Sequence, residues 1–232
     1  MHKSLLSASL IALALAAPIA NAHEAGDILV RAGAITVNPK ADSGSVKVDR
    51  GPVAGTNLGG KATMSSDTQL GLNFAYMLTN NIGIELLAAT PFEHDVKLKN
   101  TALAPANGKL GTLKHLPPTL SVVYYPLDSK SVFQPYVGAG INYTWIYDEH
   151  VGSRASAAGF DNFRAKNSWG LAWQVGADYM LTDKLMLNAQ VRYIDINTTA
   201  YVDNNSVAPG TRAKVNVDVD PMVYMVGLGY KF

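Results

Sequence analysis

The side chains best suited to chemistry are four of the five histidines, His23, His94, His115 and His150, and the acids beside two of them. A hydrolase needs a histidine held near a serine or a carboxylate. His94–Asp95 and Glu149–His150 are adjacent pairs, but neighbours along a strand point to opposite sides. The fourth histidine, His23, lies near the N-terminus, and the others fall in or beside long polar connections. We therefore expect no catalytic residues and no enzyme.

The same residues are weak candidates for a metal site. His94, Asp95, His115 and Glu149 carry donor atoms that metals accept, but their spacing matches no metal-binding motif. The chain has no cysteine, which excludes disulfides and thiolate ligands. We expect neither a metal nor a cofactor.

The first 22 residues have the three-part layout of a secretory signal. A short basic start at His2 and Lys3 precedes an uncharged apolar run from Leu5 to Ala17, and Ala20-Asn21-Ala22 offers a cleavage site. The run is shorter than the roughly 20 residues that a spanning helix needs. We expect a signal peptide at 1–22 and one mature domain at 23–232.

Charge in the mature chain is balanced. Lys3 is the one basic residue of the leader, so the rest of the 19 basic residues match the 18 acidic ones. A nucleic-acid partner would need a basic surplus, and we expect none.

The last segment shows the clearest strand pattern. From Met222 to Phe232, large residues alternate with smaller ones, so that bulk lies on one face and Gly227 and Gly229 lie on the other. Side chains alternate across a strand, so the bulky face can meet lipid and the other face the lumen. Tyr230 and the terminal Phe232 resemble the C-terminal assembly signal of outer-membrane barrels, which barrel assembly machinery would read.

The same alternation recurs in seven upstream segments. They are Asp27–Val37, Gln69–Leu78, Ile82–Ala89, Leu116–Tyr125, Tyr136–Trp145, Trp169–Tyr179 and Leu185–Ile194. A soluble eight-stranded barrel would put its apolar column inside, whereas here most bulk lies on the outward column. The fold class predicted is all-β, an eight-stranded antiparallel transmembrane β-barrel in the outer membrane of a Gram-negative bacterium. Arg at outward Val226 or Leu171 should therefore destabilise it more than a small polar residue at inward Gly227.

Connections of two lengths alternate between these strands. The short ones are 79–81, 127–131 and 182–184, and the long polar ones are 38–67, 93–115, 148–166 and 197–217. Short turns of such barrels face the periplasm and long loops face outward. We expect the four long segments to be extracellular loops.

With these segments in order, the sequence resembles the OmpW family of outer-membrane proteins, most closely its OprG branch. The stretches that carry the resemblance are AGDILVRAGAITVNP (25–39), ELLAATPF (85–92), KHLPPTL (114–120), PYVGAGINYT (135–144), SWGLAWQVGADYMLTDKLMLNAQVRYIDI (168–196) and VDVDPMVYMVGLGYKF (217–232). The resemblance implies an eight-stranded barrel with a hydrophobic interior that takes up small, mostly hydrophobic molecules passively.

Pro91 has two readings in the sequence. Proline donates no backbone hydrogen bond and is rare inside a paired strand, so Pro91 either ends its strand or breaks the pairing and opens a gap in the wall. The resemblance favours the gap, because the family's proposed exit for apolar cargo is a lateral opening at such a proline.

Inward positions differ along the barrel. Toward the periplasmic rim they include four charged residues, which we expect to form an ionic cluster: Arg31, Glu85, Asp178 and Lys231. Farther out the predicted lumen lining is mainly apolar and comprises Ile35, Leu87, Ala89, Arg192, Ile194, Val223 and Met225. Arg192, Gln69 and Asn188 temper that apolarity.

Two functions remain open. The first is a channel for small hydrophobic molecules, with lateral exit near Pro91. The second is a structural or surface-interaction barrel whose long loops bind ligands or host factors. Either protein would have outer-membrane lipid and lipopolysaccharide around it.

Overall fold

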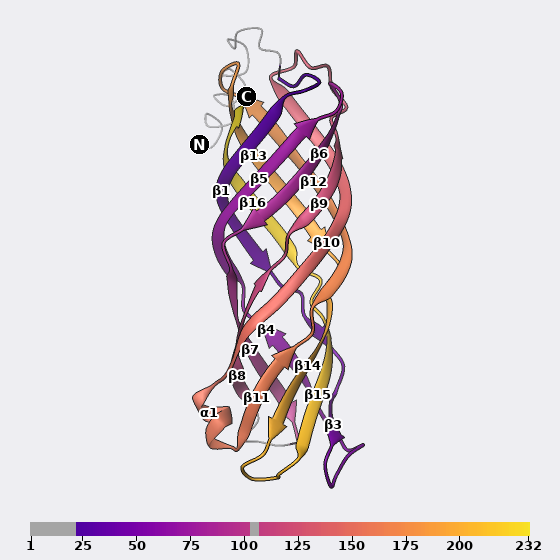
Figure 1. The fold of residues 1–232 in the computed structure, drawn as a ribbon, viewed down its shortest axis with the longest axis vertical. Coiled ribbons are helices and arrows are strands. Elements are labelled where there is room, and N and C mark those ends of the chain that lie inside the picture. Colours follow the sequence, from indigo (N-terminus) through magenta and orange to yellow (C-terminus); the bar gives the residue numbers. More distant parts are fainter. Residues whose placement is uncertain (1–21, 103–106) are drawn as a thin grey trace, which may run out of the picture.

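The computed structural model describes residues 22–102 and 107–232, and the predicted signal peptide lies almost wholly outside them. Within the described residues, eight antiparallel strands close into a barrel (Figure 1). In order around the barrel they are β1 (Ile28–Asn38), β5 (Asp67–Met77), β6 (Ile82–Ala89), β9 (Thr119–Tyr124), β10 (Phe133–Val151), β12 (Ser168–Met180), β13 (Leu185–Ile194) and β16 (Met222–Lys231). These are the eight predicted segments, which confirms the fold class.

Pairing of the first strand with the last closes the barrel. Residues 29–38 of β1 pair with 231–222 of β16, and Gly33 faces Gly227. A side chain at Gly33 would collide with the backbone oxygen of Val226, and one at Gly227 with that of Ala32. A side chain at Gly227 would therefore have to shift the two strands, because they approach closely at this glycine pair. The predicted order against Arg at Val226 or Leu171 stays a prediction.

The four long connections are not loops, which corrects the prediction. They form a second sheet that continues the barrel beyond the membrane part, and we call it the extension (Figure 1). Besides the far half of β10, it contains β2 (Asp42–Ser43), β3 (Val46–Arg50), β4 (Asn57–Met64), β7 (Phe92–Thr101), β8 (Gly108–Leu116), α1 (Ser153–Ala157), β11 (Phe160–Ala165), β14 (Asn197–Asn204) and β15 (Thr211–Asp218).

The strand β10 joins the two parts. Its 19 residues span roughly 60 Å at about 3.3 Å per residue. Residues 133–144 pair with β12 inside the barrel, whereas Trp145 to Val151 pair with β8 in the extension. The extension is therefore fixed to the barrel by a continuous backbone.

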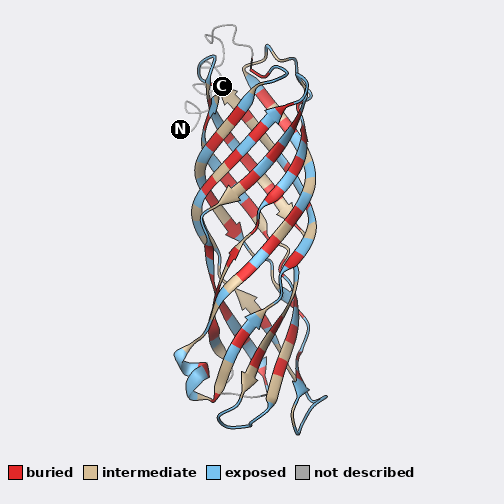
Figure 2. Cartoon of the chain, in the orientation of Figure 1, coloured by how far each residue is buried: buried red, intermediate tan, exposed pale blue. Residues whose placement is uncertain are grey.

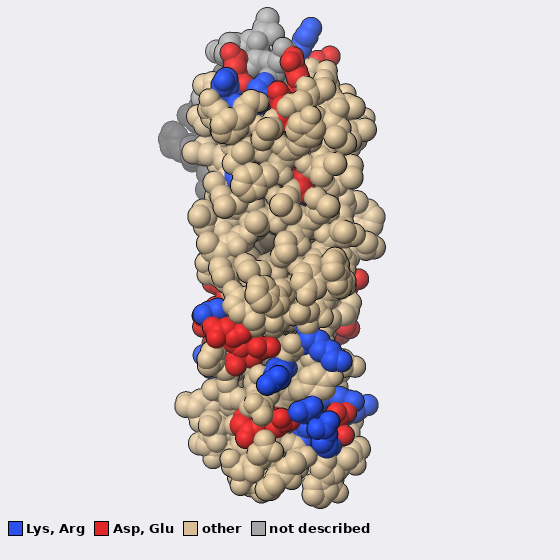
Figure 3. Space-filling view, viewed as in Figure 1, with Lys and Arg blue, Asp and Glu red and all other residues tan. Residues whose placement is uncertain are grey.

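Burial alternates along the barrel strands (Figure 2). Outward residues such as Leu171 and Val226 are 53% and 64% exposed, and inward ones such as Ile35 and Met225 are almost fully buried. On the face shown in Figure 3 the surface of this part is nearly free of charge, whereas Lys, Arg, Asp and Glu gather on the extension and at the opposite end. This apolar belt is the surface that lipid covers. No helix among the described residues is long and apolar enough to cross a membrane.

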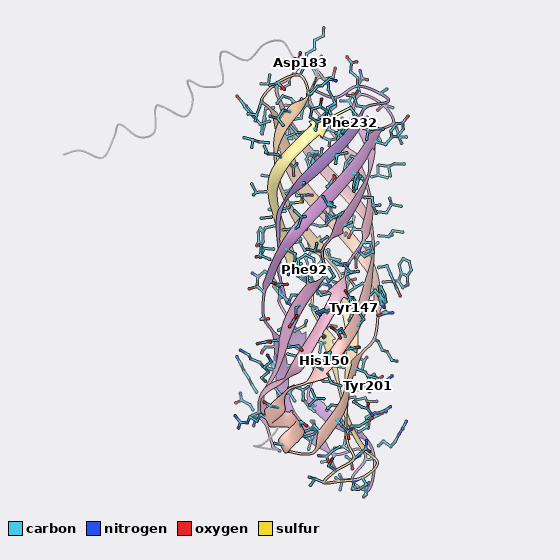
Figure 4. All side chains as sticks on the ribbon, turned by 60° about the vertical axis from the view of Figure 1, so that its left-hand side comes forward. Phe92, Tyr147, His150, Asp183, Tyr201 and Phe232 are labelled. Atoms are coloured by element: carbon cyan, nitrogen blue, oxygen red, sulfur yellow. The ribbon has the colours of Figure 1, made fainter. Side chains whose placement is uncertain are left out.

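The end that carries the C-terminus and the short turns is the periplasmic end, at the top of Figure 1. Phe232 and Asp183 lie there, and His150 lies in the extension (Figure 4). Tyr230 and Phe232 project outward, with ring centroids 4.8 Å apart. They are thus accessible at the rim, as an assembly signal would need to be.

Candidate functional site

A cluster of buried charges fills the lumen near the periplasmic end. Arg31 binds Asp178 through two hydrogen bonds, of 3.0 Å from Nε and 2.5 Å from Nη2, and its Nη1 lies 3.4 Å from Glu85 Oε2. Arg192 Nη2 lies 2.6 Å from Glu85 Oε1. All four side chains are at most 1% exposed. We call these four residues the charged floor; its two cations balance its two anions.

Neutral polar groups surround the charged floor. Arg31 donates to Tyr125 Oη at 2.8 Å and to Asn73 at 3.1 Å. Asp178 accepts from Asn188 at 2.8 Å and lies 3.1 Å from His23 Nε2. Such hydrogen bonds offset part of the cost of removing charges from water.

Two predicted assignments are exchanged: Lys231 lies outside the charged floor, and Arg192 belongs to it. Lys231 forms an ion pair with Asp27, with Nζ 3.7 Å from the carboxylate, and none of the ion pairs among the described residues joins it to Glu85 or Asp178. It sits too close to the rim, where its strand meets the start of β1. Arg192, predicted to line the apolar section, reaches back to Glu85 and Gln174 instead. Sequence reasoning missed Gln174, His23 and Tyr125, whose roles depend on contacts across the lumen.

Beyond the floor the lumen is apolar and closely packed. The predicted lining residues Ile35, Leu87, Ile194, Val223 and Met225 are at most 3% exposed and belong to one hydrophobic cluster, with Ala89 packed against it. This cluster continues into the extension. The interior cavity at the junction has a volume of about 30 Å³, which accommodates roughly one water molecule. Side chains thus fill most of the lumen at this level.

The wall has a break beside Pro91. The ladder between β6 and β9 ends at the pair Leu87–Thr119, and the ladder between β7 and β8 begins at Phe92–His115. Between these pairs, the segments 88–91 and 116–118 face each other without a ladder. A pocket of about 250 Å³ occupies the break and is lined by Ala88, Ala89, Leu116, Pro117, Pro118, Tyr143 and Trp145. Pro91 is exposed and does not line this pocket, but it follows the lining residues Ala88 and Ala89 along the chain.

Asn142, on β10, holds one edge of the break from inside the lumen. Its Nδ2 donates to the carbonyl oxygens of Pro117 and Pro118 at 3.0 and 3.1 Å, and to Thr119 Oγ1 at 3.0 Å. Asn142 is itself fully buried. Together with the bond from the Tyr143 backbone N–H to the Pro118 carbonyl at 3.1 Å, these bonds tie the 117–118 edge of the break to β10.

Two of the histidines considered for chemistry come together at the same level. His94 Nε2 and His115 Nε2 are 2.8 Å apart, and both rings stack with Phe92, which lies where the barrel meets the extension (Figure 4). Asp95 instead pairs with Lys109, and Glu149 accepts from the backbone of Ala165. The four candidate metal ligands thus do not converge.

Comparison with known proteins places this architecture. The OmpW family model matches residues 24–232. Outer membrane protein W of Escherichia coli K12 is 42% identical over 230 residues, which cover 99% of this chain and 100% of the relative. The crystal structure of OprG from Pseudomonas aeruginosa is 46% identical with a TM-score of 0.85, and the match covers 92% of this chain and 99% of that one.

A more distant relative is the dibenzothiophene metabolism operon protein PahQ of Pseudomonas aeruginosa. It is 25% identical over 174 residues, which cover 75% of this chain and 76% of the relative. The family match spans the whole barrel and its extension. The chain therefore belongs to the OmpW family and is an outer-membrane β-barrel of a Gram-negative bacterium.

Proposed function

We propose that the protein is a passive channel for small, mainly hydrophobic molecules that leave sideways through the wall beside Pro91. The observation that carries this proposal is the position of the break. It faces lipid where the apolar lumen ends, on the extracellular side of the charged floor.

The charged floor argues against a straight route to the periplasm. An apolar molecule that passed it would have to separate ion pairs in a narrow lumen, and a charge left unpaired there is costly. Leaving through the break should cost less free energy than passing the floor. The break lacks a backbone ladder, and its lining side chains are mostly apolar.

Displacing the 117–118 edge of the break from β10 requires Asn142 to release the two proline carbonyls. Its bonds to the two proline carbonyls are each worth about 1 kcal/mol net, so a transient opening is within thermal reach. From the inner face of the wall, the side chain thereby holds the 117–118 edge of the break in place.

A relative supports the substrate class. PahQ is named for an operon of dibenzothiophene metabolism, and that compound is an apolar aromatic molecule. We propose the same broad class for this chain, without a specific substrate. Lipid and lipopolysaccharide would surround the exit, and barrel assembly machinery would read Tyr230 and Phe232.

The route is tested with variants in one uptake assay, in vesicles with lipopolysaccharide in the outer leaflet and dibenzothiophene as probe. Pro91→Val should allow further pairing of the wall and lower the initial uptake rate severalfold, whereas Asn142→Ala should raise it. Ala139→Val, on the outward face of β10, is the matched control and should leave the rate unchanged.

A second pair of changes tests the direct route. Arg31→Gln with Glu85→Gln removes one cation and one anion from the floor, so the remaining two charges still balance. This variant should not raise uptake if cargo leaves sideways. Full uptake by Pro91→Val together with faster uptake by the floor variant would refute lateral exit. Absence of uptake in every variant that folds would favour a structural or surface-interaction protein.

A further inference from the structure

The histidine pair, His94 and His115, is a polar group in an otherwise mainly apolar part of the interior. His94 on β7 and His115 on β8 are 0% and 5% exposed, and both lie outside the membrane-spanning barrel. They line the small interior cavity together with Thr144 and apolar residues such as Met64, Leu113 and Ile146. Few other side chains that line this cavity are polar.

The protons of the pair follow from their partners. His94 Nδ1 lies 2.6 Å from the carbonyl oxygen of Ser65, which can only accept, so His94 carries its proton on Nδ1. In a neutral ring Nε2 is then an acceptor. His115 must therefore donate from Nε2 across the 2.8 Å contact. The proton of His115 is thus on Nε2, and its Nδ1 is a bare acceptor.

Both rings stay neutral near pH 7. Burial is the main cause that lowers the pKa of His94, and burial together with His94 lowers that of His115 to about 3. Asp67 favours protonation of both rings, but more weakly than burial opposes it. The proton assignment for neutral rings therefore applies under physiological conditions.

The acceptor of His115 has no partner. Its Nδ1 is buried and makes no hydrogen bond among the described residues. Most other buried polar atoms without a partner surround the charged floor, and Thr211 Oγ1 is the exception. A buried acceptor without a donor costs free energy that a ligand can recover.

The pair also stands beside the exit. His115 directly precedes Leu116, Pro117 and Pro118, which line the break in the wall, and Thr144 lies between Tyr143 and Trp145, which line its other side. The cavity and the break therefore lie on opposite faces of the same two strands. A molecule that moves from the extension to the break passes His115.

We propose that His115 Nδ1 accepts a hydrogen bond from the transported molecule, so that among mainly hydrophobic molecules those that carry one hydrogen-bond donor, such as alcohols, phenols and secondary amides, bind more tightly. This inference rests on the proposed channel function. Ethers, ketones and hydrocarbons of equal size gain nothing at Nδ1, because they cannot donate. The cavity at rest accommodates a hydroxyl group, and a larger body must displace flexible side chains such as Met64.

The test compares phenol with anisole, which has nearly the same shape but no donor. Protein labelled with ¹⁵N-histidine in lipid nanodiscs is titrated with each probe. Phenol should shift the Nδ1 resonance of His115 toward the hydrogen-bonded range, and anisole should not. Phenol should also bind about fivefold more tightly, the ratio that one net hydrogen bond supplies. Acetophenone, an acceptor alone, should behave like anisole.

The variants refine the test. His115→Phe together with His94→Phe keeps aromatic rings against Phe92 and also removes His94 Nε2, which His115→Phe alone would leave as a bare acceptor. The phenol preference should then fall to about one. His150→Phe, whose wild-type side chain is 68% exposed, is the control and should keep the preference. Equal binding of phenol and anisole by the wild type, with Nδ1 unmoved, would overturn the inference even if uptake through the wall is normal. Because this assay reads binding, failure of uptake in the Pro91 experiment would refute the channel without altering the result at His115.

Discussion

The barrel buries polar groups in two places, and the two differ in how their chemistry is completed. In the charged floor, two guanidinium groups and two carboxylates neutralise each other. In the histidine pair, two neutral rings share one hydrogen bond and leave an acceptor free. The floor is complete as a set of charges and closes the lumen, whereas the pair lacks one donor. Both clusters contain buried polar atoms without a partner, but those at the floor surround charges that already balance, so we expect a ligand at the pair only.

The largest effect should come from breaking an ion pair of the charged floor, which should lower the free energy of unfolding. Asp178→Asn leaves Arg31 without its main anion in a buried position and should cost about 3–5 kcal/mol. Urea unfolding in lipid vesicles measures this cost. Asp178→Asn combined with Arg31→Gln removes the unpaired charge and should recover part of the loss. A cost below 1 kcal/mol for the single change would mean that water reaches the floor.

Breaking the histidine pair should cost less. His94→Phe leaves the Ser65 carbonyl and the His115 N–H without partners and should cost about 1–3 kcal/mol, measured by the same unfolding assay. His150→Phe, at an exposed site, should stay within about 0.5 kcal/mol of the wild type. Equal effects at the two positions would show that the pair is solvated.

Low pH should lower the stability of the protein through the histidine pair. The pKa of His115 is lowered in the fold to about 3, so the unfolded chain takes up a proton first as the pH falls below about 6.5. Stability is therefore greatest above that value and is lost toward lower pH, by about 1 kcal/mol between pH 7 and pH 5.5 for this one residue. Comparing this loss in the wild type and in His115→Phe isolates its contribution. The same loss in both would assign the pH dependence to other groups.

Removing both histidines should have the smallest effect. With His94→Phe and His115→Phe together, the His115 N–H is removed but the Ser65 carbonyl still lacks its donor, so the double change should cost less than His94→Phe alone, about 1 kcal/mol. A loss near that of the single His94→Phe change would show that the pair is needed for folding rather than for a ligand.

The sequence predicted the barrel because lipid imposes an outward apolar column that alternation reveals. It did not predict the extension, although the alternation there is equally regular. In the strand Thr211–Asp218, Ala213, Val215 and Val217 are buried and the residues between them are more exposed. Outside the membrane the apolar face turns inward, so a search for bulky outward columns read these strands as polar loops.

The site was predictable only in part. The charges of the floor could be inferred from inward positions near one end, and three of the four expected members form it. Arg192 replaces Lys231 because a long side chain can reach a carboxylate several residues along the lumen, and alternation reports only the face. His94 and His115 lie 21 residues apart and meet through the register of β7 and β8, which the sequence does not specify.

The charged floor also bears on how the chain inserts. Its four side chains come from β1, β6, β12 and β13, and Asp178 lies 147 residues after the Arg31 that it binds. Until those strands meet, Arg31 in an open sheet would face hydrocarbon without its partner, which the bilayer penalises by several kcal/mol. A partial barrel is therefore unstable in the membrane, because these charges are paired only when the barrel is closed. The floor therefore favours complete barrels over fragments in the membrane.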